Sequence, residues 1–236
     1  MRALMYVDFQ LAKKQFRYGL MLAILFSVMI MASSLFGEAG EVSESIADLQ
    51  APIMAMVALM CGMMLMFGVF GPDESGGWPE TRLSLPVTKR EVVGARYALM
   101  AIVGAITTAI GALASVVVGA IAATMINGVA ATMLSPLEVV VVAVVVLATL
   151  LFFYAIEMPI IFRLGIAAAR YSLAAFWLIP VAVTIPPVRE FLDGVILTLD
   201  GVTDLTPIVA GFVAIVVVLY LASMMLSASI YAKREL

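Results

Sequence analysis

The 236-residue sequence contains no histidine and only one cysteine. Without histidine, the chain lacks the commonest general base and the commonest metal ligand of proteins. A single cysteine cannot form an internal disulfide, and Cys61 stands in an apolar run where it is expected to pack as a small hydrophobic side chain. No stretch has the G-x-x-x-x-G-K-[ST] pattern of a phosphate-binding loop. We therefore expect no catalytic residues, no metal site and no cofactor in this chain.

Charged residues are also scarce. The chain is 64% hydrophobic and 12% charged, whereas a typical soluble domain is about 45–50% apolar and about 25% charged. A soluble fold of this size could not bury so much apolar surface, so lipid must be the solvent for most of the chain. The uncharged runs are long enough to cross a bilayer as helices. The sequence therefore predicts a single all-α integral membrane domain over residues 1–236, with no partner role for nucleic acid.

Uncharged runs predict six transmembrane helices. The run that starts at residue 97 is too long for one helix, and Asn127-Gly128 and Ser135-Pro136 are turn signals inside it. Pro136 suits the first position of a helix, and Glu138 then lies in the first turn, where the helix dipole favours an anion. The expected spans are 18–37, 50–71, 97–126, 136–161, 170–187 and 206–232.

The distribution of basic residues predicts the orientation. With six spans, twelve of the 13 lysines and arginines fall on one side of the membrane, and only Arg189 falls on the other. Five or seven spans would scatter them over both faces. The basic side is cytoplasmic by the positive-inside rule, and it includes both chain ends. The twelve are Arg2, Lys13, Lys14, Arg17, Arg82, Lys89, Arg90, Arg96, Arg163, Arg170, Lys233 and Arg234.

The first seventeen residues alternate apolar and polar positions with a helical period. This pattern suits an amphipathic helix over 1–17 that lies in the membrane interface, with its basic face toward anionic lipid. The alternative is that these residues form only the cytoplasmic turns of the first span.

The cytoplasmic loop between the second and third spans has the signals of a short helix and an elbow, over residues 77–96. Pro79 suits a first helical position, and Pro86 ends the short helix after about two turns. Thr88 and Glu91 form a capping-box pattern at the start of the next helix. Either a partner protein or the ends of the spans must cover the apolar side chains of this loop. They are Trp78, Leu83 and Leu85.

Small residues recur along the third span. One row contains Gly111, Ser115, Gly119 and Ala123, and a parallel row contains Gly104, Thr108 and Ala112. Such rows let helices approach closely in lipid, either inside one bundle or at the interface of a dimer.

Two further features lie in the second and fourth spans. The second span is rich in methionine, which serves either ordinary packing or a wall that faces a peptide or lipid substrate. Glu157 in the fourth span is an intramembrane carboxylate and hence a candidate functional group. Alternatively, Glu157 pairs with Arg163 near the cytoplasmic interface. The candidate wall residues are Met56, Met60, Met63 and Met64.

Two stretches resemble a known family. Residues 80–97, which include SLPVTKREVV and ARY, resemble the cytoplasmic loop of ABC-2 type transporter permeases. Residues 159–165, PIIFRLG, with Ala169-Arg170, are similar to the loop after the fourth span of the same proteins. The resemblance is to the small six-span bacterial branch that includes permeases for phenol-soluble modulins and antimicrobial peptides. The six-span layout matches this branch over the whole chain, although the outer loop between the last two spans is brief.

The resemblance implies partners and a location. Such a permease pairs with a separate cytoplasmic ATPase that holds ATP and Mg²⁺, and with a second permease copy as a homodimer or close heterodimer. It lies in the bacterial inner membrane. The coupling helix of the family maps to about residues 77–85 of this chain. The expected ATPase contacts are Trp78, Glu80, Arg82, Leu83 and Leu85.

The resemblance implies ATP-driven export. The spans are apolar and nearly free of charge, which favours amphipathic peptides or lipid-like molecules as the substrate. The alternatives are an ATP-independent channel or carrier, and a purely structural membrane subunit. An intramembrane enzyme is disfavoured because the chain has no histidine and no paired acids within the spans. The direction of transport stays open.

Overall fold

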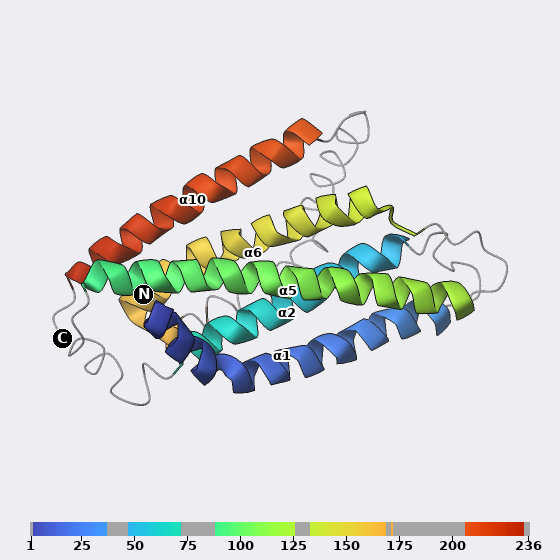
Figure 1. Ribbon diagram of the computed structural model, residues 1–236, viewed down its shortest axis with the longest axis horizontal. Coiled ribbons are helices and arrows are strands. Elements are labelled where there is room, and N and C mark those ends of the chain that lie inside the picture. The colour runs from blue at the N-terminus through green and yellow to red at the C-terminus, as the bar shows by residue number, and fades with distance from the viewer. Residues whose placement is uncertain are drawn as a thin grey trace.

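The computed structural model describes residues 2–36, 47–71, 88–125, 133–168, 171 and 206–233, and all structural statements refer to these residues. All regular structure among them is helical, which confirms the predicted all-α class for this part of the chain (Figure 1). The long helices are α1 (Arg2–Phe36), α2 (Ala47–Phe70), α5 (Lys89–Met125), α6 (Pro136–Leu164) and α10 (Thr206–Ala232).

Four of these helices, α2, α5, α6 and α10, are long and apolar enough to cross a membrane. The first expected span, 18–37, falls mostly inside α1, which is not among the four. The fifth expected span, 170–187, lies outside the described residues except for residue 171. Six spans and the cytoplasmic placement of the chain ends therefore stay predictions.

Helix lengths compare directly with the thickness of a bilayer. At about 1.5 Å per residue, 29 residues of α6 extend about 44 Å, and 37 residues of α5 extend about 55 Å. The hydrocarbon core is about 30 Å thick. The helix α5 is thus long enough to cross the core and to project beyond it by several turns. Its first turns, from Lys89 to Arg96, correspond to the elbow expected from the sequence.

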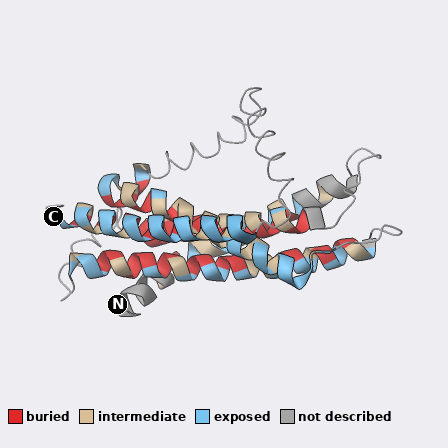
Figure 2. Cartoon of the chain, turned by 90° about the horizontal axis from the view of Figure 1, so that it is seen from above, coloured by how far each residue is buried: buried red, intermediate tan, exposed pale blue. Residues whose placement is uncertain are grey.

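The helices form one bundle with α2 near its centre. The helix α2 packs against α1, α5 and α6, while α10 packs against α6 and α5. The first turns of α1 run at an angle to the rest of that helix, and α10 diverges from α6 toward the end where both begin (Figure 1). Buried residues follow the inward sides of the helices, and exposed ones cover the outer sides (Figure 2). The core therefore runs along the bundle around α2.

The start of α6 is fixed by a capping box. Ser135 is the N-cap, and its side chain accepts a hydrogen bond of 3.3 Å from the backbone N–H of Glu138. The Glu138 carboxylate accepts a bond of 2.7 Å from the backbone N–H of Ser135. Pro136 follows at the first helical position, where its missing N–H costs nothing. The predicted helix start at Pro136 is confirmed, and the reciprocal box adds to it.

Glycines of α5 permit close contact inside the bundle. A Cβ built on Gly111 would lie 2.6 Å from the backbone oxygen of Met54 in α2. A Cβ on Gly119 would lie 2.6 Å from the side-chain nitrogen of Gln50, which is also in α2. Gly104 faces α6. These contacts confirm that the small residues of the third span serve packing within one bundle.

Candidate functional site

Five predicted ATPase contacts, Trp78, Glu80, Arg82, Leu83 and Leu85, lie outside the described residues, which omit 72–87. The structure describes the two ends of this segment. On one side α2 ends at Phe70, and on the other side Thr88 caps α5. The hydroxyl of Thr88 accepts a bond of 3.3 Å from the N–H of Glu91, and the Glu91 carboxylate accepts one of 2.8 Å from the N–H of Thr88. The predicted capping box is confirmed.

The end of α2 and the first turns of α5, which flank this segment, meet at a buried cluster. We call it the aromatic junction, and it is formed by Phe70, Arg96, Phe162 and Tyr231. The guanidinium carbon of Arg96 lies 4.4 Å from the ring centroid of Phe70 and 5.8 Å from that of Phe162. Arg96 is only 4% exposed. An arginine suits this position because its guanidinium is weakly hydrated and stacks on aromatic faces.

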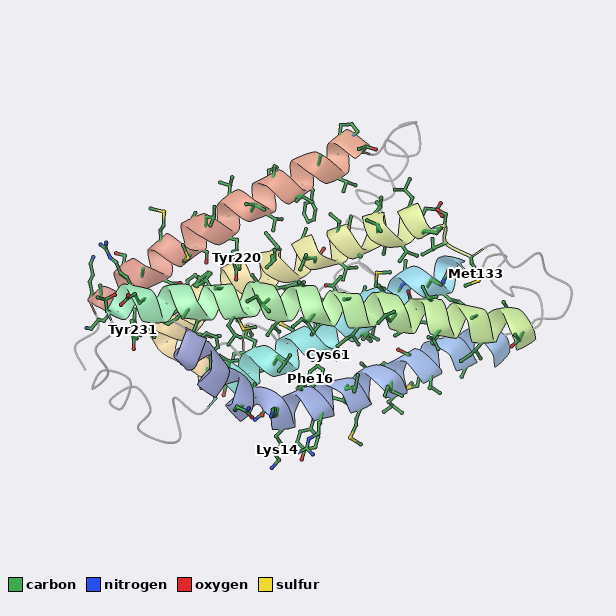
Figure 3. All side chains as sticks on the ribbon, viewed as in Figure 1. Lys14, Phe16, Cys61, Met133, Tyr220 and Tyr231 are labelled. Atoms are coloured by element: carbon green, nitrogen blue, oxygen red, sulfur yellow. The ribbon has the colours of Figure 1, made fainter. Side chains whose placement is uncertain are left out.

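The aromatic junction connects four helices. The rings of Phe70 and Phe162 meet edge to face at 5.7 Å between centroids, and those of Phe162 and Tyr231 meet at 5.5 Å. Phe70 ends α2, Arg96 belongs to the first turns of α5, and Phe162 and Tyr231 belong to the last turns of α6 and α10. Tyr231 marks this end of the bundle in Figure 3, and Met133 marks the opposite end. The aromatic junction therefore joins four helices at one end of the bundle.

A second buried network joins α10 to α5 and α6. The hydroxyl of Tyr97 lies 2.8 Å from that of Ser223 and 2.7 Å from that of Ser227. Ser223 donates its single proton to the carbonyl oxygen of Ala155 at 2.6 Å. Tyr97 therefore donates to Ser223 and accepts from Ser227. The hydroxyl of Tyr220 donates a hydrogen bond of 2.7 Å to the carbonyl oxygen of Tyr97, and the centroids of the two rings lie 5.1 Å apart.

Our sequence reasoning missed this network, although α10 carries a visible pattern. Its polar and aromatic side chains recur at intervals of three or four residues on an otherwise apolar helix, which places them on one face. Such a row marks the side of a transmembrane helix that faces its neighbours. The row consists of Tyr220, Ser223, Ser227 and Tyr231, and all four are buried.

Glu157 and Arg163 lie in different surroundings. Glu157 is fully buried on α6, whereas Arg163 is exposed in the last turn of that helix. Six residues of a helix correspond to a rotation of about 240°, so the two side chains leave α6 on different faces. The structure thus places Glu157 inside the bundle. Its functional role stays a prediction.

The four methionines proposed as a substrate wall differ in how deeply they are buried. Met63 is 8% exposed and belongs to the main core, while Met56, Met60 and Met64 are half-buried. Met64 borders an apolar groove of about 780 Å³ whose other lining residues all come from α1 and include Tyr18 and Met21. Only part of the proposed wall therefore reaches a surface.

Within the described ranges, no group of three or more Cys, Asp or Glu side chains is arranged to hold a metal ion. What the described residues supply is a buried aromatic and hydroxyl framework at one end of an apolar bundle.

A bundle of long apolar helices with no catalytic constellation among the described residues belongs to the class of multi-pass membrane proteins. The model of one family, described as ABC-2 family transporter protein, matches residues 3–232. The chain is therefore a member of the ABC-2 transporter family, whose members are membrane permeases. No curated protein and no solved structure matches it.

Proposed function

We propose that this chain is the permease subunit of an ATP-driven exporter, with six spans and both chain ends in the cytoplasm. A separate ATPase binds the segment 77–85 through Trp78, Glu80, Arg82, Leu83 and Leu85. Two permease copies enclose the path, and closure of the ATPase dimer rocks the bundles against each other. The family membership over residues 3–232 supports this proposal.

The observation that carries the coupling mechanism is the position of Arg96. Its side chain is buried against Phe70, so the residues that precede and follow the segment 72–87 are joined directly. Phe162 and Tyr231 extend this contact to α6 and α10. A push on the segment would reach four helices at once, rather than being absorbed by a loose loop.

The nature of the bundle supports an apolar or amphipathic substrate of the peptide or lipid class, such as the modulin-like peptides handled by the bacterial branch that the sequence resembles. The groove beside Met64 is lined by α1 and α2 with apolar side chains only, apart from the Tyr18 hydroxyl. A groove of this composition favours acyl chains and apolar helix faces over ions or sugars, because it offers no charge to an ion and only the Tyr18 hydroxyl to a sugar.

Cysteine labelling tests the orientation. The single native cysteine, Cys61, is fully buried and so gives little background. Ser84→Cys places a thiol in the proposed coupling segment, and Ser135→Cys places one at the exposed start of α6. In intact bacteria, a membrane-impermeant maleimide should label only the Ser135→Cys variant. Labelling of the Ser84→Cys variant from outside would refute ATPase coupling through this segment.

Charge reversal tests the coupling. The double variant Glu80→Arg/Arg82→Glu, purified with the proposed ATPase partner, should lose substrate-stimulated ATP hydrolysis while its yield and melting temperature stay normal. The control is Lys14→Glu, an exposed position on α1 that points away from the bundle (Figure 3). Full stimulation in the double variant would remove segment 77–85 from the ATPase interface.

A further inference from the structure

A groove with basic residues at its rim lies where the first turns of α5 cross the last turns of α10. We call it the basic groove. It has a volume of about 450 Å³, and its apolar floor includes Val93, Met224 and Ala228. Arg90 and Lys233 stand at its rim, and both are exposed. The aromatic junction and the Tyr97 network do not include any of these residues.

Among the described residues at this corner, cations outnumber acids. A third cation, Lys89, donates a hydrogen bond of 3.4 Å to the carbonyl oxygen of Ala232 and thereby joins α5 to the end of α10. The nearest acid in sequence, Glu91, accepts bonds from the backbone N–H and the hydroxyl of Thr88, at 2.8 Å and 2.9 Å. Its carboxylate is thus held at the helix cap. Arg90 and Lys233 are left to face the groove.

We propose that the basic groove binds an anionic phospholipid of the cytoplasmic leaflet. Its phosphate would lie between Arg90 and Lys233, and an acyl chain would lie along Val93, Met224 and Ala228. Basic pockets between membrane helices attract anionic headgroups, while an apolar floor excludes small soluble anions from most of the volume. The assignment to this leaflet rests on the orientation given under Proposed function.

A second copy of the chain fits the groove less well. In a twofold dimer centred on this groove, the same patch of each subunit meets its equivalent, so Arg90 and Lys233 of one copy would lie against the same two cations of the other. Like charges at the centre of an interface are unfavourable. A lipid phosphate, in contrast, complements both cations. Charge complementarity therefore favours the lipid over self-association at this surface.

The test compares lipids that differ only in headgroup. The full chain is purified in a mild detergent, and its affinities for phosphatidylglycerol and phosphatidylcholine of identical acyl chains are measured by native mass spectrometry. The wild type should prefer phosphatidylglycerol. The double variant Arg90→Gln/Lys233→Gln should bind phosphatidylglycerol about 30-fold more weakly, since each cation near a headgroup contributes about 1 kcal/mol. Its affinity for phosphatidylcholine should not change.

Two further variants make the result specific. Arg163→Gln removes an exposed cation from the last turn of α6, outside the groove, and should retain the wild-type preference. Ala228→Trp fills the apolar floor and should weaken binding of both lipids. An equal loss in Arg163→Gln would reduce the effect to general surface charge and overturn the proposal. So would unchanged affinity in Arg90→Gln/Lys233→Gln, or a shift of that variant from dimer to monomer without a change in lipid affinity.

These outcomes are distinct from failure of the proposed transport function. The lipid measurement requires neither the ATPase nor a substrate, so loss of ATP coupling leaves it intact. Labelling of the Ser84→Cys variant from outside would place the groove in the outer leaflet and would overturn the leaflet assignment alone.

Discussion

The helices α2 and α10 are almost equally apolar, with mean hydropathies of 2.4 and 2.6 over their candidate spans. However, α2 lies at the centre of the bundle and α10 at its periphery. In the most apolar stretch of α2, 67% of residues are buried inside the structure, against 17% in α10. Hydropathy therefore predicts that each helix enters the membrane but not where it lies in the bundle. In lipid, an outward face is as apolar as a core.

The two helices are also held by different interactions. Backbone contact at small residues holds α2, since Gly68 of α2 abuts Ala12 of α1 and Gly111 of α5 abuts Met54 of α2. The C-terminal half of α10 is held by hydroxyl groups that bond to α5 and α6. Close packing thus places the central helix, and a few polar contacts attach the peripheral one.

The largest effect is expected where a side chain is forced between α2 and α5. The variant Gly111→Ala would place a methyl group 2.6 Å from the backbone oxygen of Met54, so the helices must separate. Overpacking of this kind costs about 1–3 kcal/mol, and contact with backbone favours the upper end. The free energy of unfolding in mixed micelles measures the loss.

The matched control is Gly211→Ala in α10, where nothing lies within 4 Å of the added methyl group. Its stability should stay the same or rise slightly, because alanine is the better helix former. Equal losses in the two variants would mean that α10 is as closely packed in the membrane as α2, and the contrast between the helices would be wrong.

The next effect concerns the end of α2. Arg96→Met keeps most of the side-chain volume but removes the charge that stacks on Phe70 at 4.4 Å. A desolvated cation–π contact contributes about 2 kcal/mol, so we expect a loss of that order together with weaker coupling to ATP hydrolysis. Arg163→Met, at an exposed position of α6, is the control and should change stability by less than about 0.5 kcal/mol. If Arg96→Met kept full coupling to ATP hydrolysis, the aromatic junction would have no role in coupling the ATPase to the helices.

Much of the fold follows from local signals. Ser135, Pro136 and Glu138 predict the start of α6, and the Thr88–Glu91 box predicts the start of α5. The expected last span, 206–232, coincides with α10. These features depend on hydrogen bonds and dihedral angles within a few residues, so they can be read directly from the sequence.

The contacts between helices could be predicted only in part. The glycine rows of α5 indicate close approach, but they do not say which helix approaches. Tyr97 bonds to Ser223 and Ser227, which are 126 and 130 residues away, and the sequence alone does not pair them. Arg96 was counted only as a cytoplasmic cation, whereas the structure buries it on Phe70. Amphipathic periodicity fails here because lipid and core are both apolar.

A smaller effect is expected for the hydroxyl groups that attach α10. Tyr97→Phe removes the bonds to Ser223 and Ser227 and should cost about 1 kcal/mol, in the range of hydrogen bonds between membrane helices. Tyr154→Phe is the matched control. The Tyr154 hydroxyl is fully buried beside Gly62 of α2 and has no hydrogen-bond partner among the described residues. Its removal should be neutral or stabilising. A larger loss for Tyr154→Phe would show that this hydroxyl has an essential partner.

The smallest effect is expected where the start of α10 diverges from α6. Ala214 is exposed and borders a cavity of about 530 Å³ between α6 and α10, which Val141 and Val213 also line. Ala214→Leu should fill part of this cavity and change the free energy of unfolding by less than about 0.5 kcal/mol. The contrast with Gly111→Ala is the sharpest form of the comparison, because both variants enlarge a small residue in an apolar helix. If Ala214→Leu destabilised the protein as strongly, another segment or subunit would have to occupy the cavity, and the divergence of α10 from α6 would not persist in the membrane.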